Sequence, residues 1–178
     1  KDFLFMAAPS FSKFLLSLVH KKQHAEISCD VFAQMMDPMA KDLSKLEDKD
    51  FVIDVRTIEN EDGKNKTVIG LIGIDRPFII DSLIAVVHSH DFRLSGLLYE
   101  RFFVDKKAGL GKNYLKKQNK NTFDVGYTYA ELTNTLLPKQ EKALLADLQQ
   151  MAQDVKLATR DWQPMLEQLR RTKAEMAL

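Results

Sequence analysis

The feature that most constrains the fold of this chain is a pair of apolar stretches separated by turn-forming residues. Phe51, Ile53 and Val55 lie two positions apart, as residues on one face of a strand do. A second apolar stretch covers residues 67–74, and the turn-rich run Asn-Glu-Asp-Gly-Lys-Asn fills residues 60–65 between them. Because Asn, Asp and Gly favour tight turns, the two stretches are predicted to form a β-hairpin, which indicates an antiparallel or mixed sheet.

One helix and two further strands are predicted after this hairpin. Asp-Arg-Pro at residues 75–77 ends the second strand and opens a helix with proline in its first turn. The apolar face of that helix holds Ile80, Leu83, Ile84 and Val87. A long strand is predicted over residues 93–104. After a polar connection at residues 106–121, an alternating strand is predicted to be half-buried and to complete a second hairpin; its apolar positions are Phe123, Val125, Tyr127 and Tyr129.

Helical patterns lie on both sides of this sheet in the sequence. Ser10 is placed to cap an N-terminal amphipathic helix, whose apolar positions are Phe11, Phe14, Leu15, Leu18 and Val19. Ile27, Val31 and Met35, four residues apart, predict a second helix. Asp37-Pro38 is predicted to cap a further short helical segment that reaches Leu46.

The C-terminal part of the chain predicts a long amphipathic helix beginning near Pro138. Its apolar stripe has spacings of four and three residues and comprises Leu144, Leu148, Met151, Val155, Ala158 and Trp162. Pro164 is predicted to break or kink this helix before a final helix that carries Leu166 and Leu169.

The order of elements predicts an α+β fold. A four-stranded antiparallel or mixed sheet in a split βαβ arrangement, with helices on one face, fits this order best. We expect a helical N-terminal segment over residues 1–48 and an α+β domain with C-terminal helices over residues 49–178.

Composition and motifs exclude several classes of function. The 26 basic and 25 acidic residues give a net charge of +1, so the chain has no global field for binding nucleic acid or a membrane surface. No run approaches the ~20 apolar residues needed to span a bilayer, and the single cysteine, Cys29, fits a cytoplasmic protein. The run at residues 109–113 lacks the spacing of a phosphate loop, and no dinucleotide fingerprint or metal-ligand set occurs. We therefore expect no catalytic residue, metal ligand or cofactor site within this chain.

The strand-to-helix junction at residues 73–77 is the one place where a small ligand is physically reasonable. Free N–H groups and the positive dipole end at a helix start favour an anion such as an amino-acid carboxylate. An ordinary capped helix start is the alternative. The candidate effector-binding residues are Asp75, Arg76, Pro77, Asp81 and Ser82.

These junction residues also carry a family resemblance. Asp75-Arg76-Pro77 is similar to the D-R-P-G signature of ACT domains, which are small amino-acid-sensing modules of ferredoxin-like fold, although Phe78 stands in place of the glycine. Residues 75–82 as a whole resemble the D-x-P-F-[LI]-[VI]-D-S segment in the N-terminal ACT-like region of the large bacterial NAD-specific glutamate dehydrogenases. The resemblance covers residues 51–178, except that Tyr99-Glu100-Arg101 replaces a His-Pro-containing stretch.

The resemblance implies a regulatory or assembly region of an oligomeric, cytoplasmic, bacterial enzyme. The parent enzyme would use NAD to deaminate L-glutamate oxidatively, on a catalytic domain outside this chain. Because the sequence starts at Lys1 without an initiator Met, we also expect it to be a piece of a longer polypeptide. The alternatives are a freestanding ACT-like amino-acid sensor and a scaffold that self-associates or packs on other domains, through a sheet edge or the helix face of residues 144–162.

Overall fold

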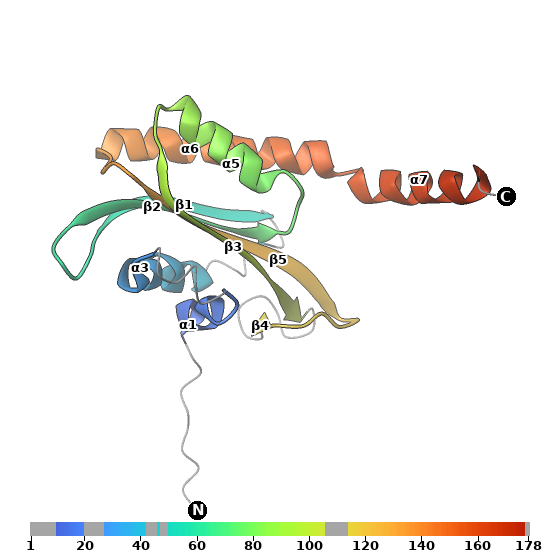
Figure 1. Cartoon of the computed structure of the whole chain (residues 1–178), viewed down its shortest axis with the longest axis horizontal. Helices are drawn as coiled ribbons and strands as arrows, with labels where there is room; N and C mark the ends of the chain where they lie inside the picture. The colour runs from blue at the N-terminus through green and yellow to red at the C-terminus, as the bar shows by residue number, and fades with distance from the viewer. Residues whose placement is uncertain (1–9, 20–26, 42–45, 47–49, 106–113, 177–178) are drawn as a thin grey trace, which may run out of the picture.

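The computed structural model of the chain describes residues 10–19, 27–41, 46, 50–105 and 114–176. The helices over these residues are α1 (Phe11–Leu16), α3 (Cys29–Met39), α5 (Ile79–Ser89), α6 (Pro138–Thr159) and α7 (Trp162–Met176). The strands are β1 (Phe51–Glu59), β2 (Asn65–Ile74), β3 (Leu94–Asp105), β4 (Tyr114–Leu115) and β5 (Thr122–Leu132). The strands form one antiparallel sheet in the order β1-β2-β5-β3-β4 (Figure 1).

The sheet has the predicted α+β, ferredoxin-like arrangement. β1 and β2 form the predicted hairpin, in which Glu59 pairs with Asn65 and Gly63 has a φ of 74°, a value that suits glycine. β5 lies between β2 and β3, so β2, α5 and β3 make a split βαβ unit, and β1 occupies the edge beside β2. The two-residue strand β4, which the sequence did not predict, pairs with Phe103 and Val104 of β3.

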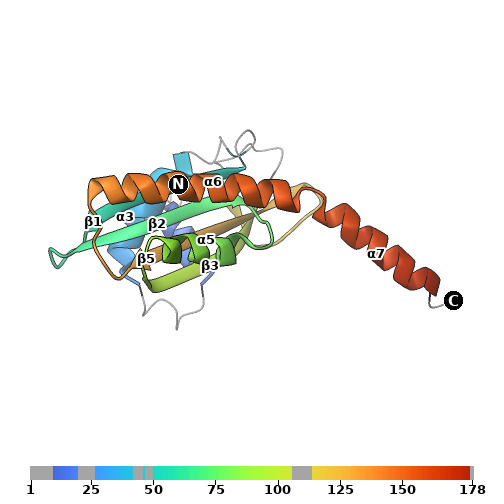
Figure 2. The same ribbon diagram turned by 90° about the horizontal axis from the view of Figure 1, so that it is seen from above.

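Helices cover both faces of the sheet. The helices α5 and α6 pack on one face, as Figure 2 shows from above. The N-terminal helices α1 and α3 cover the opposite face, where their apolar side chains form one cluster with those of the sheet. Gly70 permits this approach, because a Cβ atom there would lie 2.5 Å from the Met39 sulfur. The helices of the predicted segment 1–48 thus share a core with the sheet.

The burial of β5 differs from the prediction of a half-buried strand. Its residues from Val125 to Glu131 are all buried. Tyr127 and Tyr129 point into the cluster with α1 and α3, whereas Ala130 and Leu132 belong to the cluster with α5 and α6. The alternation of apolar and polar residues predicted that helices cover only one face of the sheet at β5, but α1 and α3 cover its second face as well.

Asp37-Pro38 does not cap a new helix, contrary to the prediction. α3 runs through both residues and ends at Met39. The Asp37 carboxylate instead accepts the backbone N–H of Ser12 at 2.7 Å and the Ser12 hydroxyl at 3.0 Å, which ties α1 to α3. The predicted cap at Ser10 is confirmed, since its hydroxyl accepts the N–H of Lys13. Most of the further segment predicted to reach Leu46 lies outside the described residues.

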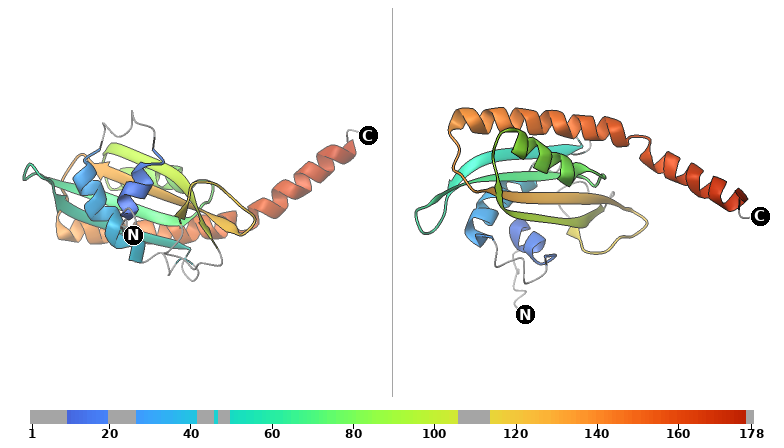
Figure 3. Two further views of the ribbon diagram at one scale, coloured as in Figure 1. Left: turned by 90° about the horizontal axis from the view of Figure 1, so that it is seen from below. Right: turned by 45° about the horizontal axis from the view of Figure 1, so that its top comes forward.

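The long C-terminal helix is confirmed over most of its predicted stripe. The buried residues of this stripe are Leu144, Leu148, Met151 and Val155. The helix ends at Thr159, so the break falls before Pro164, which lies in the first turn of α7 where proline is tolerated. The final helix α7 then extends away from the body of the molecule (Figure 3).

Substitution of Leu148 tests the packing of α6 on the sheet. Leu148 is fully buried, so Leu148→Ala should lower the free energy of unfolding by about 2–5 kcal/mol through lost burial and a residual cavity. Leu157, on the same helix, is 67% exposed, and Leu157→Ala should change the free energy by less than about 0.5 kcal/mol. Chemical denaturation of the two variants measures the difference, and equal effects would contradict the packing.

Candidate functional site

The junction between β2 and α5 forms an open groove of about 560 Å³. The residues that line this groove are Asp75, Arg76, Pro77, Phe78, Ile79, Ile80, Asp81, Tyr99 and Arg101. Of the predicted effector-binding residues, Asp75, Arg76, Pro77 and Asp81 therefore share one surface. Ser82 is not among the lining residues, and its backbone N–H donates to the Phe78 carbonyl to make the first bond of the helix.

The helix begins later than the sequence predicted. Phe78 is the N-cap residue of α5, so Pro77 precedes the helix instead of occupying its first turn. Phe78 has a φ of 70°, in the left-handed region that bulky residues rarely adopt, and its side chain makes no cap hydrogen bond. The N–H groups of Ile79, Ile80 and Asp81 consequently precede the first intrahelical bond, and these three residues line the groove.

Asp75 is held by two residues of β3 that the sequence did not single out for binding. The Tyr99 hydroxyl donates to one oxygen of the Asp75 carboxylate at 2.5 Å, and an Arg101 Nη1 atom lies 3.4 Å from the other. Gly126 of β5 lies beneath them, and a Cβ atom there would come within 3.1 Å of the Tyr99 ring. No local pattern in the sequence could assign Tyr99 and Arg101 to the junction, because their position depends on the pairing of β3 with β5.

Arg76 bridges the junction to two other elements. Its Nη2 atom donates to the Asp50 carboxylate at 2.7 Å, and its Nη1 atom lies 3.4 Å from the Thr159 hydroxyl at the end of α6. Lys156 of α6 approaches the same Asp50 oxygen at 3.4 Å. The Arg76 Nε atom is buried and has no acceptor among the described residues. Arg76 thus holds the junction against α6, and the Arg76 side chain also lines the groove.

The protonation of Tyr99 keeps it a hydrogen-bond donor. Burial, the hydrogen bond to Asp75 and the charge of that carboxylate raise the pKa of Tyr99 far above its usual value of 10. The phenol therefore keeps its proton even in alkaline solution, and it donates to Asp75. The groove thus presents a hydroxyl from Tyr99 and charges of both signs, negative from Asp75 and Asp81 and positive from Arg101.

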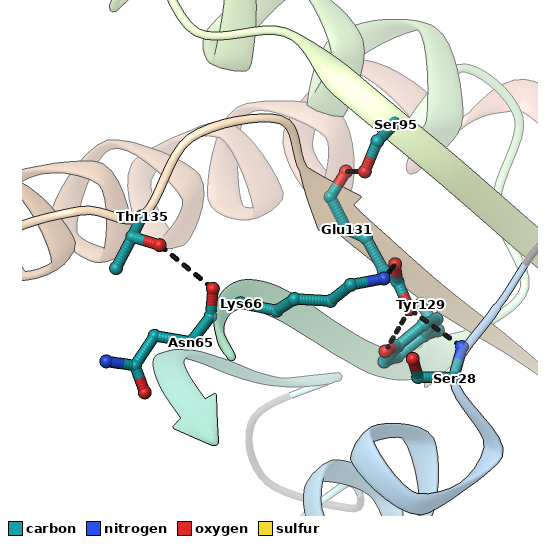
Figure 4. Close-up of polar contacts among 7 residues, drawn as sticks. All are labelled: Ser28, Asn65, Lys66, Ser95, Tyr129, Glu131 and Thr135. Atoms are coloured by element: carbon teal, nitrogen blue, oxygen red, sulfur yellow. Dashed lines mark hydrogen bonds and ion pairs between the residues drawn. The ribbon is translucent and has the colours of Figure 1, made fainter. Parts of the chain in front are cut away.

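A second polar cluster surrounds Glu131 on the opposite face of the sheet (Figure 4). The Glu131 side chain is 1% exposed and pairs with Lys66. It also accepts the Tyr129 hydroxyl at 2.9 Å and the backbone N–H of Ser28, at the start of α3, at 3.2 Å. These donors satisfy a buried carboxylate and attach α3 to β5, so the cluster has a structural role.

The described residues contain no metal-binding cluster and no membrane-spanning helix. Within residues 10–19, 27–41, 46, 50–105 and 114–176, no group of three or more His, Cys, Asp or Glu residues could hold a metal ion. No helix in the same part of the chain is long and apolar enough to cross a membrane. His20 and His24, two other residues with metal-binding side chains, lie outside the described residues. Comparisons with protein-family models, curated proteins and solved structures found no match for this chain.

Three tyrosines, the buried Tyr127 and Tyr129 and the half-buried Tyr99, should make the stability of the chain sensitive to alkaline pH. Burial raises the pKa values of Tyr99, Tyr127 and Tyr129 above 10 in the folded state, so the folded chain retains protons that the unfolded chain loses. Stability should be unaffected by these groups below pH 10 and should fall as the pH rises above it. We expect tyrosinate absorbance from these residues to rise together with unfolding, and Tyr129→Phe to reduce the slope. Their independent ionisation near pH 10 in the folded chain would contradict this expectation.

Removal of the buried carboxylate tests the second cluster. Glu131→Ala leaves the Tyr129 hydroxyl and the Ser28 N–H without an acceptor, which should cost about 2–4 kcal/mol of stability, whereas Lys66 is partly exposed and can turn to water. Glu59→Ala, at an exposed position of β1, is the matched control and should change stability by less than about 0.5 kcal/mol. In a double-mutant cycle, Tyr129→Phe should cost less in the Glu131→Ala background than alone. Additive effects would show that the two side chains are not coupled.

Proposed function

We propose that this chain is a non-catalytic regulatory and assembly domain of an NAD-dependent glutamate dehydrogenase. The parent enzyme would convert L-glutamate to 2-oxoglutarate and ammonium in the bacterial cytoplasm, with NAD bound on a catalytic domain elsewhere in the polypeptide. In this proposal the chain itself contributes no catalytic residue, metal ligand or cofactor contact. Its role is to bind a small amino-acid effector and to contact other copies or domains.

The observation that carries the proposal is the position of the Asp-Arg-Pro-Phe segment on the fold. The resemblance placed residues 75–82 at a strand-to-helix junction of an ACT-like sheet. The chain has a ferredoxin-like sheet, and this segment connects β2 to α5 in its split βαβ unit. The match between a sequence resemblance and an independent arrangement of strands supports the family assignment, and the groove at the same junction supports a binding role.

The chemistry of the groove is complementary to a free amino acid. Arg101, which is 57% exposed, offers a cation for an α-carboxylate, and Ile79 and Ile80, whose N–H groups precede the first intrahelical bond of α5, line the same groove. The exposed carboxylate of Asp81 offers a partner for the ammonium group. Phe78, 54% exposed, supplies apolar surface for the side chain of the ligand. A zwitterion would therefore meet both signs of charge within one groove.

The outer edge of β3 supports the assembly role. Among the described strands, β4 pairs with β3 only at Phe103 and Val104, so the edge from Leu94 to Phe102 has no strand beside it. An open edge of this length can pair with the same edge of a second copy. Sedimentation that shows a strict monomer at high concentration would contradict self-association through this edge.

The alternative is a freestanding ACT-like module that senses an amino acid or binds another protein. The groove supports this alternative as much as it supports the first proposal, because an amino-acid site on this chain is independent of the reaction that the complete polypeptide catalyses. The two proposals differ in what the complete polypeptide does.

An activity assay of the complete polypeptide decides between them. We expect the polypeptide that contains this chain to reduce NAD when L-glutamate is supplied, and the present chain alone to show no such activity. A complete polypeptide that folds but does not oxidise glutamate would overturn the dehydrogenase proposal and leave the freestanding module.

Calorimetry tests the effector site. The chain is titrated with each of the proteinogenic amino acids, and at least one should release or absorb heat on binding. Arg101→Ala should weaken that binding by about tenfold or more, because a charge-assisted contact is lost. Lys117→Ala, an exposed lysine in the β4–β5 connection, should leave the affinity unchanged. Absence of heat with every amino acid would overturn the effector role.

A further inference from the structure

The final helix α7 projects from the body of the molecule. Figures 1, 2 and 3 show it continuing beyond the sheet and beyond α5. Its apolar side chains Met165, Leu169 and Met176 are 58%, 64% and 83% exposed. The direction of such a helix is therefore determined where it joins the body, because its far end has no apolar packing to hold it.

The helix that precedes α7 is fixed at its end. Thr159, the last residue of α6, is 5% exposed, and its hydroxyl lies 3.4 Å from Arg76 of the β2–α5 junction. Asp50, which immediately precedes β1, pairs with both Arg76 of the junction and Lys156 of α6. These contacts hold the last turn of α6 against the sheet, so a change in the direction of α7 must occur after Thr159.

The joint between the two helices consists of Arg160 and Asp161. The next residue, Trp162, places its ring against Phe78, with ring centroids 5.9 Å apart and planes at 80°. This edge-to-face geometry is favourable for aromatic pairs. The pair ties the first residue of α7 to the residue that begins α5.

Phe78 is an unusual residue for this position. Its φ of 70° is strained for a side chain with a Cβ atom, and its ring is 54% exposed. Burial of the ring therefore does not explain why phenylalanine occupies a position where glycine would be unstrained. The contact with Trp162 does explain it, because glycine could not make that contact.

We propose that the β2–α5 junction sets the direction of α7, through a joint formed by the Phe78–Trp162 pair and the Arg76 bridge. Phe78 and Arg76 also line the groove, so the wall of the groove and the joint are built from the same residues. A ligand that contacts Phe78 changes the surface on which Trp162 rests and thereby turns α7. This response to a ligand rests on the proposed function, whereas the joint itself does not.

Distance measurements between two spin labels test the joint. One label is attached to Cys29, the single cysteine of the chain, which is exposed at the start of α3, and the other to Lys173→Cys on α7. In the labelled chain without a further substitution, we expect the distribution of label-to-label distances to have one dominant maximum. In the labelled chain that also carries Phe78→Gly, we expect that dominant maximum to be lost. The melting temperature of Phe78→Gly should not fall, since glycine adopts the left-handed conformation without strain. Leu157→Ala, an exposed change on α6 outside the joint, is the matched control and should keep the dominant distance.

A Phe78→Gly variant that keeps the parent distance distribution would overturn the proposed joint. A variant that unfolds is replaced by Phe78→Ala, with the same criterion. The amino acid that binds in calorimetry is then added to the labelled chain, and it should shift both the distance and the fluorescence of Trp162, the only tryptophan in the sequence. Binding without either shift overturns the coupling of ligand to α7. Absence of binding by every amino acid overturns the effector role and the coupling together, while the Phe78→Gly result still decides the joint.

Discussion

The insertion of β5 between β2 and β3 is the constraint on which the candidate site depends. It places Gly73, Gly126 and Arg101 in one row across three strands, so that the end of β2 lies near the middle of β3. Gly126 leaves room for the Tyr99 ring to reach Asp75 across β5. Residues separated by more than twenty positions in the sequence thereby form one wall of a groove. The same strand order makes β2, α5 and β3 a split βαβ unit and exposes the start of α5 beside that wall.

The N-terminal helices α1 and α3 cover the second face of the sheet. The N-terminal helices are attached by apolar packing and by a few hydrogen bonds to buried partners: the Tyr127 hydroxyl donates to the Leu15 carbonyl of α1, and Glu131 accepts the N–H at the start of α3. β5 is therefore a central strand buried on both sides. This central strand also carries Gly126, which lies beneath the Tyr99 ring at the groove, on the opposite face of the sheet from α1 and α3.

Local sequence patterns predicted most elements and four of the nine residues that line the groove, because these patterns depend on neighbouring residues. Alternation and turn residues predicted β1 and β2, and the Asp-Arg-Pro run marked the junction that lines the groove. Tyr99 and Arg101 could not be assigned to it, since their position depends on the register of β3 with β5. The left-handed conformation of Phe78 was equally hidden, because nothing local in the sequence requires a phenylalanine to adopt a positive φ. Likewise, Pro38 suggested the start of a helix, whereas packing of α3 on the sheet extends that helix through it.

We propose that the β2–α5 junction binds an amino acid at a place from which it can influence α7. Amide chemical-shift mapping of the isotopically labelled chain, titrated with L-amino acids, tests this claim most directly. If the junction binds an amino acid, the largest shifts should occur at Ile79, Ile80 and Asp81, with smaller ones at Arg101 and Trp162. Shifts confined to other surfaces, or no shifts with any amino acid, would contradict it.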